Sequence, residues 1–228
     1  MIPGARLIIL GRQGAGKGTQ CVRLSRHYVV PHISTGEMLR AATKEGTPFG
    51  LEAEGYMHRG ELLPDDVMIG IVNERLAHED TTRRGYILDG FPRTIAQAHG
   101  LVKITADQPI DLVIDLEVPR DLVLQRLAGR RVCQDCGTNY RVEASDKRRR
   151  AWTCENCGGD VVLRDDDTEE AINRRLDIYE QETMPLMDFY RERSELVVTD
   201  GVGDADDVTR RLVTTIDARR DRVRTAGA

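Results

Sequence analysis

The chain has 228 residues, and its 33 basic and 38 acidic residues give a formal net charge of −5 at pH 7. This acidic balance argues against a nucleic-acid-binding protein with a globally basic surface, so any anion site must be local. The longest apolar runs, such as residues 7–10 and 112–114, are far shorter than the roughly 20 residues that cross a bilayer. Residues 1–6 lead into an apolar run without a signal-peptide pattern, so we expect a cytoplasmic protein with no membrane segment.

Short apolar runs alternate with helical patterns along the chain. In chain order, the patterns predict a strand at 6–10, helices at 17–28, 37–44 and 64–77, a strand at 86–88, a helix at 95–101, a strand at 112–116, helices at 120–127 and 168–191, a strand at 196–199 and a helix at 204–219. Strands that alternate with such helices are typical of a parallel sheet flanked by helices. We therefore predict an α/β fold, with one compact unit as the first expectation.

The composition changes at Gly129, where glycine, cysteine and basic residues replace the α/β pattern up to Asp167. The helical pattern resumes after this segment. We therefore predict that the segment is an insertion in the core and not a terminal domain.

A glycine-rich segment, GRQGAGKGT at residues 11–19, follows the first predicted strand and opens the first predicted helix. This is the context of a P-loop, in which backbone N–H groups converge on phosphate oxygens and the lysine adds a positive charge. The alternatives are a structural turn and the start of a dinucleotide-binding fold, but the spacing and the lysine favour phosphate. The predicted phosphate-binding residues are Gly14, Ala15, Gly16, Lys17, Gly18 and Thr19.

A magnesium ligand is not obvious in this loop. Gly18 follows Lys17 where many P-loop proteins carry the serine or threonine that touches Mg²⁺, and Thr19 comes one residue later. An acid elsewhere would then hold the ion, mainly through water molecules. Asp89 ends a predicted strand and would emerge beside the loop, although a strand-ending aspartate is also a common helix cap or turn residue.

Four of the five cysteines form two C-x-x-C pairs, separated by residues 137–153. In a reducing compartment such pairs indicate metal binding more readily than disulfides. We predict one closed, structural zinc site, since four thiolates leave no coordination position for a substrate. Free thiols are the alternative. The predicted ligands are Cys133, Cys136, Cys154 and Cys157, whereas Cys21 is interpreted as a small buried residue.

Several arginines near glycines or strand ends are candidates for phosphate binding, because the guanidinium fork binds phosphate oxygens and stays charged when desolvated. Taken singly, each is more often a solvated surface charge. The candidates are Arg40, Arg93, Arg126, Arg130, Arg164 and Arg175.

Three strings occur in an order and spacing that resemble the adenylate kinase family: GAGKGTQ at 14–20, STGEMLR at 34–40 and DGFPRT at 89–94. The resemblance extends to GRRVC at 129–133, to RDDD at 164–167 and to Tyr179, Thr183, Pro185 and Leu186. It spans nearly the whole chain. The combination is specific, whereas any one string would only be suggestive.

The resemblance implies a P-loop nucleoside monophosphate kinase fold of the long bacterial type. The core would comprise residues 1–33, 64–128 and 168–228, with an AMP-binding insert at 34–63 and a zinc-binding lid at 129–167. It also implies a monomer that moves a phosphoryl group reversibly from ATP, with Mg²⁺, to AMP, which gives two ADP. Nucleic acid and membranes are not expected partners.

The family's site residues carry over to matching positions of this sequence. ATP phosphates would meet the loop residues named above together with Arg126 and Arg130. AMP would contact Thr35, Arg40, Gly90, Arg93, Gln97, Arg164 and Arg175, with Gln97 at the adenine edge. The catalytic set would be Lys17, Asp89, Arg93, Arg126, Arg164 and Arg175.

Two parts of the sequence differ from the pattern of the family that it resembles. Gln13 occupies the place of the usual proline of the loop; it removes no phosphate donor, and its expected effect is on rate. Residues 147–150, KRRR, are interpreted as a solvated basic face, and the alternative is a patch that binds nucleic acid. The open alternatives are a kinase for another nucleoside monophosphate, a kinase that uses GTP, and a nucleotide-regulated nucleic-acid binder.

Overall fold

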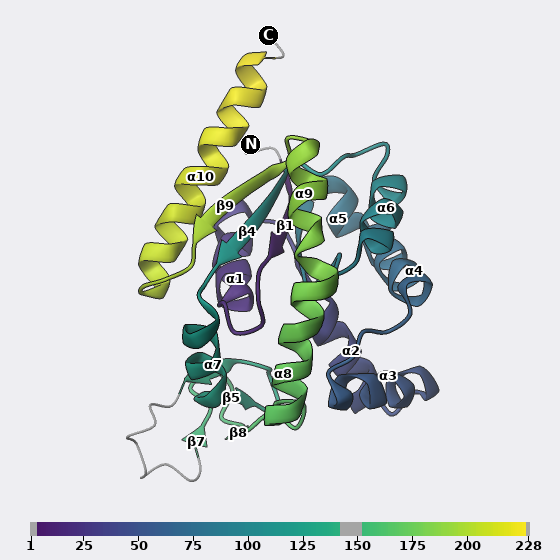
Figure 1. The fold of residues 1–228 in the computed structure, drawn as a ribbon, viewed down its shortest axis with the longest axis vertical. Helices are drawn as coiled ribbons and strands as arrows, with labels where there is room; N and C mark the ends of the chain where they lie inside the picture. Colours follow the sequence, from purple (N-terminus) through teal and green to yellow (C-terminus); the bar gives the residue numbers. More distant parts are fainter. Residues whose placement is uncertain (1–3, 142–151, 227–228) are drawn as a thin grey trace.

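The computed structural model of the chain describes residues 4–141 and 152–226. Its centre is a parallel sheet in the order β2-β3-β1-β4-β9, with helices on both faces (Figure 1). The strands are β1 (Ala5–Leu10), β2 (His32–Ser34), β3 (Gly85–Asp89), β4 (Leu112–Glu117) and β9 (Leu196–Asp200). The predicted α/β class is confirmed, and the strands expected from the sequence correspond to β1, β3, β4 and β9.

Helices connect these strands and cover both faces of the sheet. They are α1 (Lys17–Tyr28), α2 (Thr35–Lys44), α3 (Pro48–Arg59), α4 (Asp65–Leu76), α5 (Glu79–Arg84), α6 (Ile95–Ile104), α7 (Arg120–Ala128), α8 (Glu169–Ile178), α9 (Pro185–Glu192) and α10 (Ala205–Ala226). Ser34, Thr47, Thr94 and Thr168 cap helices, each accepting a hydrogen bond from the N–H three residues later. Among the residues described, no helix has the length and apolar character needed to span a membrane.

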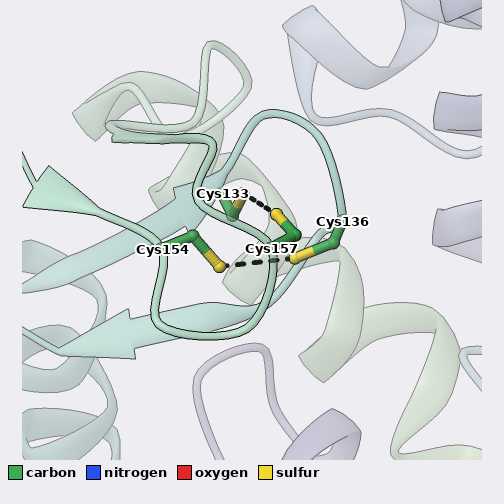
Figure 2. A group of neighbouring side chains, drawn as sticks. All are labelled: Cys133, Cys136, Cys154 and Cys157. Atoms are coloured by element: carbon green, nitrogen blue, oxygen red, sulfur yellow. Dashed lines mark hydrogen bonds between the residues drawn. The ribbon is translucent and has the colours of Figure 1, made fainter.

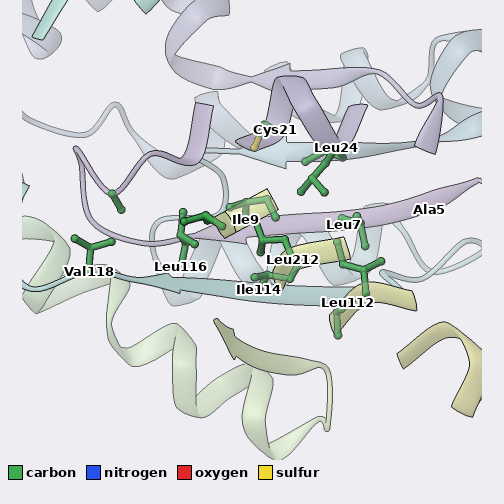
Figure 3. Close-up of a cluster of buried hydrophobic side chains, with 14 of the residues drawn as sticks. Ala5, Leu7, Ile9, Cys21, Leu24, Leu112, Ile114, Leu116, Val118 and Leu212 are labelled. Atoms are coloured by element: carbon green, nitrogen blue, oxygen red, sulfur yellow. The ribbon is translucent and has the colours of Figure 1, made fainter. Parts of the chain in front are cut away.

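The two faces of the sheet bury alternate residues of each strand. Leu7 and Ile9 belong to a cluster with Leu24 of α1 and Leu212 of α10 (Figure 3). Ile8 and Leu10 belong to the opposite cluster, which includes side chains of α4, α6 and α9. A strand buried on both faces needs apolar residues at every position, which explains why this run is conspicuous in the sequence.

The parallel register brings the ends of several strands to one edge of the sheet. Asp89 of β3 lies opposite Ile9 of β1 and Ser34 of β2, and Asp115 of β4 lies opposite Leu10. The segments that follow β1, β2 and β3 therefore leave the sheet side by side. Three sequence motifs that are far apart in the chain meet there.

The region predicted as one helix over 168–191 differs from that expectation. It consists of α8, a π-helical segment η1 (Tyr179–Thr183) and α9. The N–H of Met184 donates to the carbonyl of Tyr179 over 2.9 Å, directly before Pro185. Because proline has no N–H to donate, the regular helical pattern is interrupted and the turn widens. The sequence patterns also did not predict β2, α3 or α5.

A second, antiparallel sheet lies within the segment 129–167, in the order β6-β5-β8-β7. Its strands are β5 (Arg130–Cys133), β6 (Asn139–Arg141), β7 (Trp152–Thr153) and β8 (Asp160–Val162). Figure 1 shows this sheet at one end of the molecule, near the end of α7 and the start of α8. We call residues 129–167 the lid segment. The basic residues 147–150 lie outside the described part of the chain.

Candidate active site

A cleft of about 580 Å³ opens at the carboxyl edge of the central sheet. It is lined by the glycine-rich loop, the start of α2, the turn after β3, and side chains from α7, the lid segment and α8. A cleft of this size is typical of small-molecule sites. Every residue that the sequence predicted to contact nucleotide lines this one cleft.

The glycine-rich loop wraps around the amino group of Lys17. Its Nζ donates hydrogen bonds to the carbonyl oxygens of Gly11, at 2.6 Å, and of Arg12, at 2.9 Å. Gly14 and Gly16 have φ angles of 82° and 100°, which L side chains rarely adopt. Gly16 also precedes α1, whose first N–H groups face the loop. The loop thus concentrates N–H donors, a helix N-terminus and one ammonium group, as phosphate binding requires.

Asp89 reaches the cleft from the end of β3. Burial raises the pKa of its carboxyl, but His32 and Lys17 outweigh burial and hold the pKa below its ordinary value. Asp89 is therefore ionised at neutral pH. A Cβ atom at Gly18 would lie 3.6 Å from Asp89 Oδ2, so the missing side chain leaves space beside the carboxylate. An ionised carboxylate next to open space can bind a magnesium ion that keeps several of its water molecules.

Arg93 and Gln97 line the cleft from the turn after β3 and from the start of α6. Arg93 Nε donates to the carbonyl of Gly90 at 2.7 Å, and Thr35 Oγ1 donates to the same carbonyl at 2.9 Å. The carbonyl of Arg93 accepts a hydrogen bond from Thr183, which lies in η1, at 2.8 Å. The widened π turn therefore supports the backbone at Arg93.

The amide of Gln97 has a fixed orientation. Its Oε1 accepts a hydrogen bond from the N–H of Arg93 at 2.8 Å, and its Nε2 donates to Asp65 Oδ1 at 2.8 Å. Asp65 also accepts from Thr94. A primary amide has a second N–H and a second lone pair, so Gln97 keeps one donor and one acceptor for a ligand.

Arginines from three elements converge on two acids at the end of the lid segment. Asp166 pairs with Arg164 at 3.1 Å and with Arg175 at 2.8 Å. Asp167 pairs with Arg130 and with Arg175, the latter at 3.4 Å. Burial raises the pKa of Asp166, but the arginines outweigh it and lower the pKa to about 2. The cleft therefore holds a cluster of cations that two carboxylates balance.

Two further arginines complete the cationic lining. Arg126 Nη1 donates to the carbonyl of Ala15 at 3.0 Å, beside the glycine-rich loop. Arg40 lies on α2, where burial and the nearby Arg164 lower its pKa to about 10. It remains charged at neutral pH.

Comparisons with known proteins agree with this geometry. Residues 9–195 match the adenylate kinase family. The chain belongs to the adenylate kinase family. The adenylate kinase of Thermodesulfovibrio yellowstonii is 48% identical over 205 residues, covering 89% of this chain and 94% of that protein. The adenylate kinase of Bacillus subtilis is 48% identical over 204 residues, 89% and 93% of the two chains, and that of Moorella thermoacetica is 50% identical over 198 residues, 86% and 90%.

The family resemblance predicted from the motifs is confirmed, and the chain is a nucleoside monophosphate kinase. Three contact residues were absent from the predicted set. Asp166 and Asp167 belong to the RDDD string at 164–167, from which only Arg164 was predicted as a site residue, although adjacent acids after an arginine signal ion pairing. Asp65 orients Gln97 from the start of α4, and nothing in the local sequence distinguishes it from an ordinary helix-start acid.

Gln13 of the glycine-rich loop contacts the lid segment. Its Nε2 donates a hydrogen bond to Asp167 Oδ1 over 3.1 Å. Asp167 also accepts from Arg130 and Arg175, so one carboxylate joins the loop, the lid segment and α8. Proline has no side-chain donor and could not make this contact.

The four cysteines of the C-x-x-C pairs come together in the lid segment (Figure 2). The sulfur atoms all lie within 4.8 Å of one another, with 3.4 Å between Cys133 and Cys157 and 3.5 Å between Cys136 and Cys154. Tetrahedral zinc with Zn–S bonds of about 2.3 Å places sulfur atoms about 3.8 Å apart. The cluster therefore fits a tetrahedral metal ion, and all four predicted ligands are in place.

Proposed function

We propose that this chain catalyses the reversible transfer of the terminal phosphoryl group of ATP to AMP, giving two ADP, as a cytoplasmic monomer that uses Mg²⁺. The observation that carries the proposal is one cleft that combines three features. The glycine-rich loop, the fixed amide of Gln97 and several arginines all line it. Two nucleotides can thus place their phosphates against one another.

ATP is proposed to bind at the glycine-rich loop. The N–H groups of residues 14–19 and the ammonium of Lys17 would take its phosphates, with Arg126 and Arg130 beside them. The carbonyl oxygens that Lys17 contacts in the free protein would then give way to phosphate oxygens. Asp89 would hold the Mg²⁺ that accompanies ATP, mainly through water, and the ion would neutralise phosphate charge.

AMP is proposed to bind between Thr35, Arg40, Gly90, Arg93 and Gln97. Gln97 offers one donor and one acceptor side by side, which matches the N6 amino group and adjacent ring nitrogen of adenine. Guanine has an oxygen where adenine has the amino group. Because Arg93 and Asp65 fix the amide, it cannot rotate to suit guanine. Base preference therefore follows from the hydrogen bonds that hold Gln97.

Phosphoryl transfer is proposed to need positioning and charge neutralisation, with no covalent protein intermediate. An oxygen of the AMP phosphate is already anionic, so no protein base is required. Arg93, Arg164 and Arg175 would surround the transferred group. In the free protein Asp166 holds two of these arginines close together, which limits the rearrangement needed when phosphates arrive. Closure of the lid segment would exclude water, which otherwise accepts the phosphoryl group.

The division into moving parts is also proposed. Residues 1–33, 64–128 and 168–228 would form the rigid core, residues 34–63 would close over AMP, and the lid segment would close over ATP. Zn²⁺ bound by Cys133, Cys136, Cys154 and Cys157 would hold the lid segment in shape. It would take no part in the reaction, because four thiolates close its coordination.

The test is a coupled assay of ADP formation with AMP, GMP, CMP and UMP as acceptors. We expect AMP to exceed GMP in kcat/KM by at least about tenfold, since a matched bidentate contact contributes about 1–3 kcal/mol of discrimination. Gln97→Ala should reduce the difference. Faster turnover with any other acceptor would refute the assignment of AMP, and no ADP formation with any acceptor would refute the reaction.

A further inference from the structure

Three potential metal-ligating side chains lie together beneath the phosphate-binding loop, outside the lid cysteines. Cys21, His32 and Asp89 place one sulfur, one nitrogen and one oxygen atom within 4.8 Å of one another. They come from α1, β2 and β3. The proposed reaction uses Asp89 alone among them.

The topology explains why these side chains meet. In parallel strands, residues two apart point to the same face of the sheet. His32 lies opposite Ile87, and Asp89 is two residues beyond Ile87, so both side chains point to the same face. Ile87 belongs to the cluster formed with α1, and Cys21 lies on the side of α1 that packs over this face (Figure 3).

His32 is incompletely paired. Its Nε2 is buried and lies 3.4 Å from Asp89 Oδ2, within ion-pair distance but without the geometry of a hydrogen bond. A buried polar group with only such a contact leaves room for a better partner, and an ion held between the nitrogen and the carboxylate would satisfy both. The thiol of Cys21 is fully buried and lies nearby, which favours a partner that binds sulfur as well as nitrogen.

We propose that Cys21, His32 and Asp89 form a second cation site, selective for thiophilic divalent ions such as Zn²⁺ and Cd²⁺, whose occupancy inhibits the enzyme. Thiolate and imidazole prefer such ions over Mg²⁺, which favours oxygen ligands. Three protein ligands leave a fourth position for water. Asp89 lines the cleft, so an ion can enter from the nucleotide side.

Two features make this site weaker than the lid cysteines. It offers three protein ligands, whereas the lid cluster offers four. Lys17 is a neighbouring cation and repels a second positive charge. The site should therefore fill only after the four thiolates of the lid segment have bound metal.

Inhibition follows from the shared ligand, and this part rests on the proposed function. An ion bound by Cys21 and His32 would take the Asp89 carboxylate away from the Mg²⁺ that accompanies ATP. It would also place a fixed positive charge near Lys17. Cys21 itself contacts no nucleotide in the proposed reaction, so Cys21→Ser should leave the uninhibited rate within about twofold.

Binding is tested by equilibrium dialysis of the nucleotide-free full-length chain against Cd²⁺, with the ultraviolet thiolate-to-cadmium absorption recorded. Wild type should bind about two ions, and Cys21→Ser should bind about one. Cys21→Ser should also lose the thiolate-to-cadmium absorption of the more weakly bound ion. The matched control is Cys157→Ser, which should lose the lid ion and keep the Cys21 component. His32→Gln should weaken the second ion by at least about tenfold, and it replaces Cys21→Ser if that variant does not fold.

One bound ion in wild type, or two in Cys21→Ser with unchanged absorption, would overturn the site. Inhibition is measured separately, as ADP formation in the presence of Cd²⁺ at saturating Mg²⁺. Cys21→Ser should need at least about tenfold more Cd²⁺ for half inhibition. A second ion that binds without inhibiting would overturn the inhibitory role alone, and absence of ADP formation without Cd²⁺ would refute only the proposed function.

Discussion

The central sheet and the lid sheet are stabilised in different ways. Strands β1, β3 and β4 are buried on both faces, between two large clusters of apolar side chains. In the lid segment, the buried side chains of the described apolar cluster are Cys133, Cys154 and Val161, with Tyr140 packed against them. Two of these three are proposed metal ligands. In the described part of the lid segment, the buried apolar side chains are therefore few and centre on the cysteine cluster.

The difference shows how size decides the source of stability. A large sheet buries enough apolar surface to offset the entropy lost on folding, whereas a segment of about 40 residues does not. A metal ion bound from both ends of such a segment supplies folding free energy directly. Ion pairs then join the lid to the core through Asp166 and Asp167. In the proposed closure, a unit held in this way would keep its shape while the proposed catalytic groups of the core stay fixed.

The largest expected effect is on turnover and comes from the core. Arg93→Ala should lower kcat/KM at least about a hundredfold, equivalent to nearly 3 kcal/mol, because Arg93 is proposed to touch both AMP and the transferred group. Arg93→Lys should restore activity only in part, since an ammonium lacks the guanidinium fork. The control is Arg83→Ala, at an exposed surface pair with Glu79. A change below about threefold for Arg93→Ala with the fold intact would show that the role is misassigned.

Loss of a lid cysteine should lower the thermal stability of the protein and leave the rate of the reaction largely unchanged. Cys154→Ser should lower zinc content and reduce Tm by at least about 4 °C, while activity at low temperature falls far less than in Arg93→Ala. Elemental analysis and calorimetry measure the two quantities. Thr153→Ser serves as the control, because Thr153 is the exposed neighbour of Cys154 and its replacement removes no thiol. Unchanged melting of metal-free protein would contradict the structural role of the ion.

The core counterpart of this experiment is Leu24→Ala. Leu24 is fully buried between α1 and the sheet, so its truncation should lower the free energy of unfolding by about 2–5 kcal/mol. Zinc content should stay unchanged. If Leu24→Ala released zinc, or if Cys154→Ser lowered hydrogen-exchange protection in β1 as much as in β5, the two regions would not be independent.

A smaller effect is expected at the ion pairs that join the two regions. The pKa of Asp166 is about 2 in the folded protein, below its value in the unfolded chain. Its stabilising contribution is therefore complete above about pH 4 and is lost as pH falls through about 2, with a size on the order of 2 kcal/mol. Asp166→Asn should destabilise the protein at pH 7, and the difference from wild type should shrink at low pH.

Urea unfolding at several pH values measures this difference. The matched control is Asp165→Asn, because Asp165 is exposed and is the immediate neighbour. A destabilisation by Asp166→Asn that does not change between pH 7 and pH 2 would contradict an ionic origin.

The smallest effect is expected from Gln13. Gln13→Pro removes the hydrogen bond to Asp167, which contributes about 1 kcal/mol, and should therefore raise KM for ATP by up to about fivefold. KM for AMP should be unchanged, because Gln13 contacts the lid side of the cleft. Gln13→Ala should have the same effect. If only the proline variant changes KM, the cause is loop backbone geometry and not the side-chain contact.

Local patterns predicted most of the central sheet and a set of candidate site residues that the fold brings to one cleft. Strands β1 and β4 are recognisable because burial on both faces requires continuous apolar runs. Lys17 and the lid cysteines are recognisable because phosphate and zinc sites need particular residue types at fixed short spacings. The short strands β2 and β7 have no such pattern, since they form only when a neighbouring strand supplies their hydrogen bonds.

By itself, therefore, the sequence determined the α/β class, the family, the phosphate-binding loop and the four cysteines that come together in the lid. The tertiary structure alone decided that Asp167 would join Gln13 to Arg130, that Asp65 would fix the amide of Gln97, and that Cys21 would meet His32. These partners are separated by 11 to 154 residues in the chain. Nothing in the short stretch around any one of them indicates its partner, because the contact arises only when strands and helices pack.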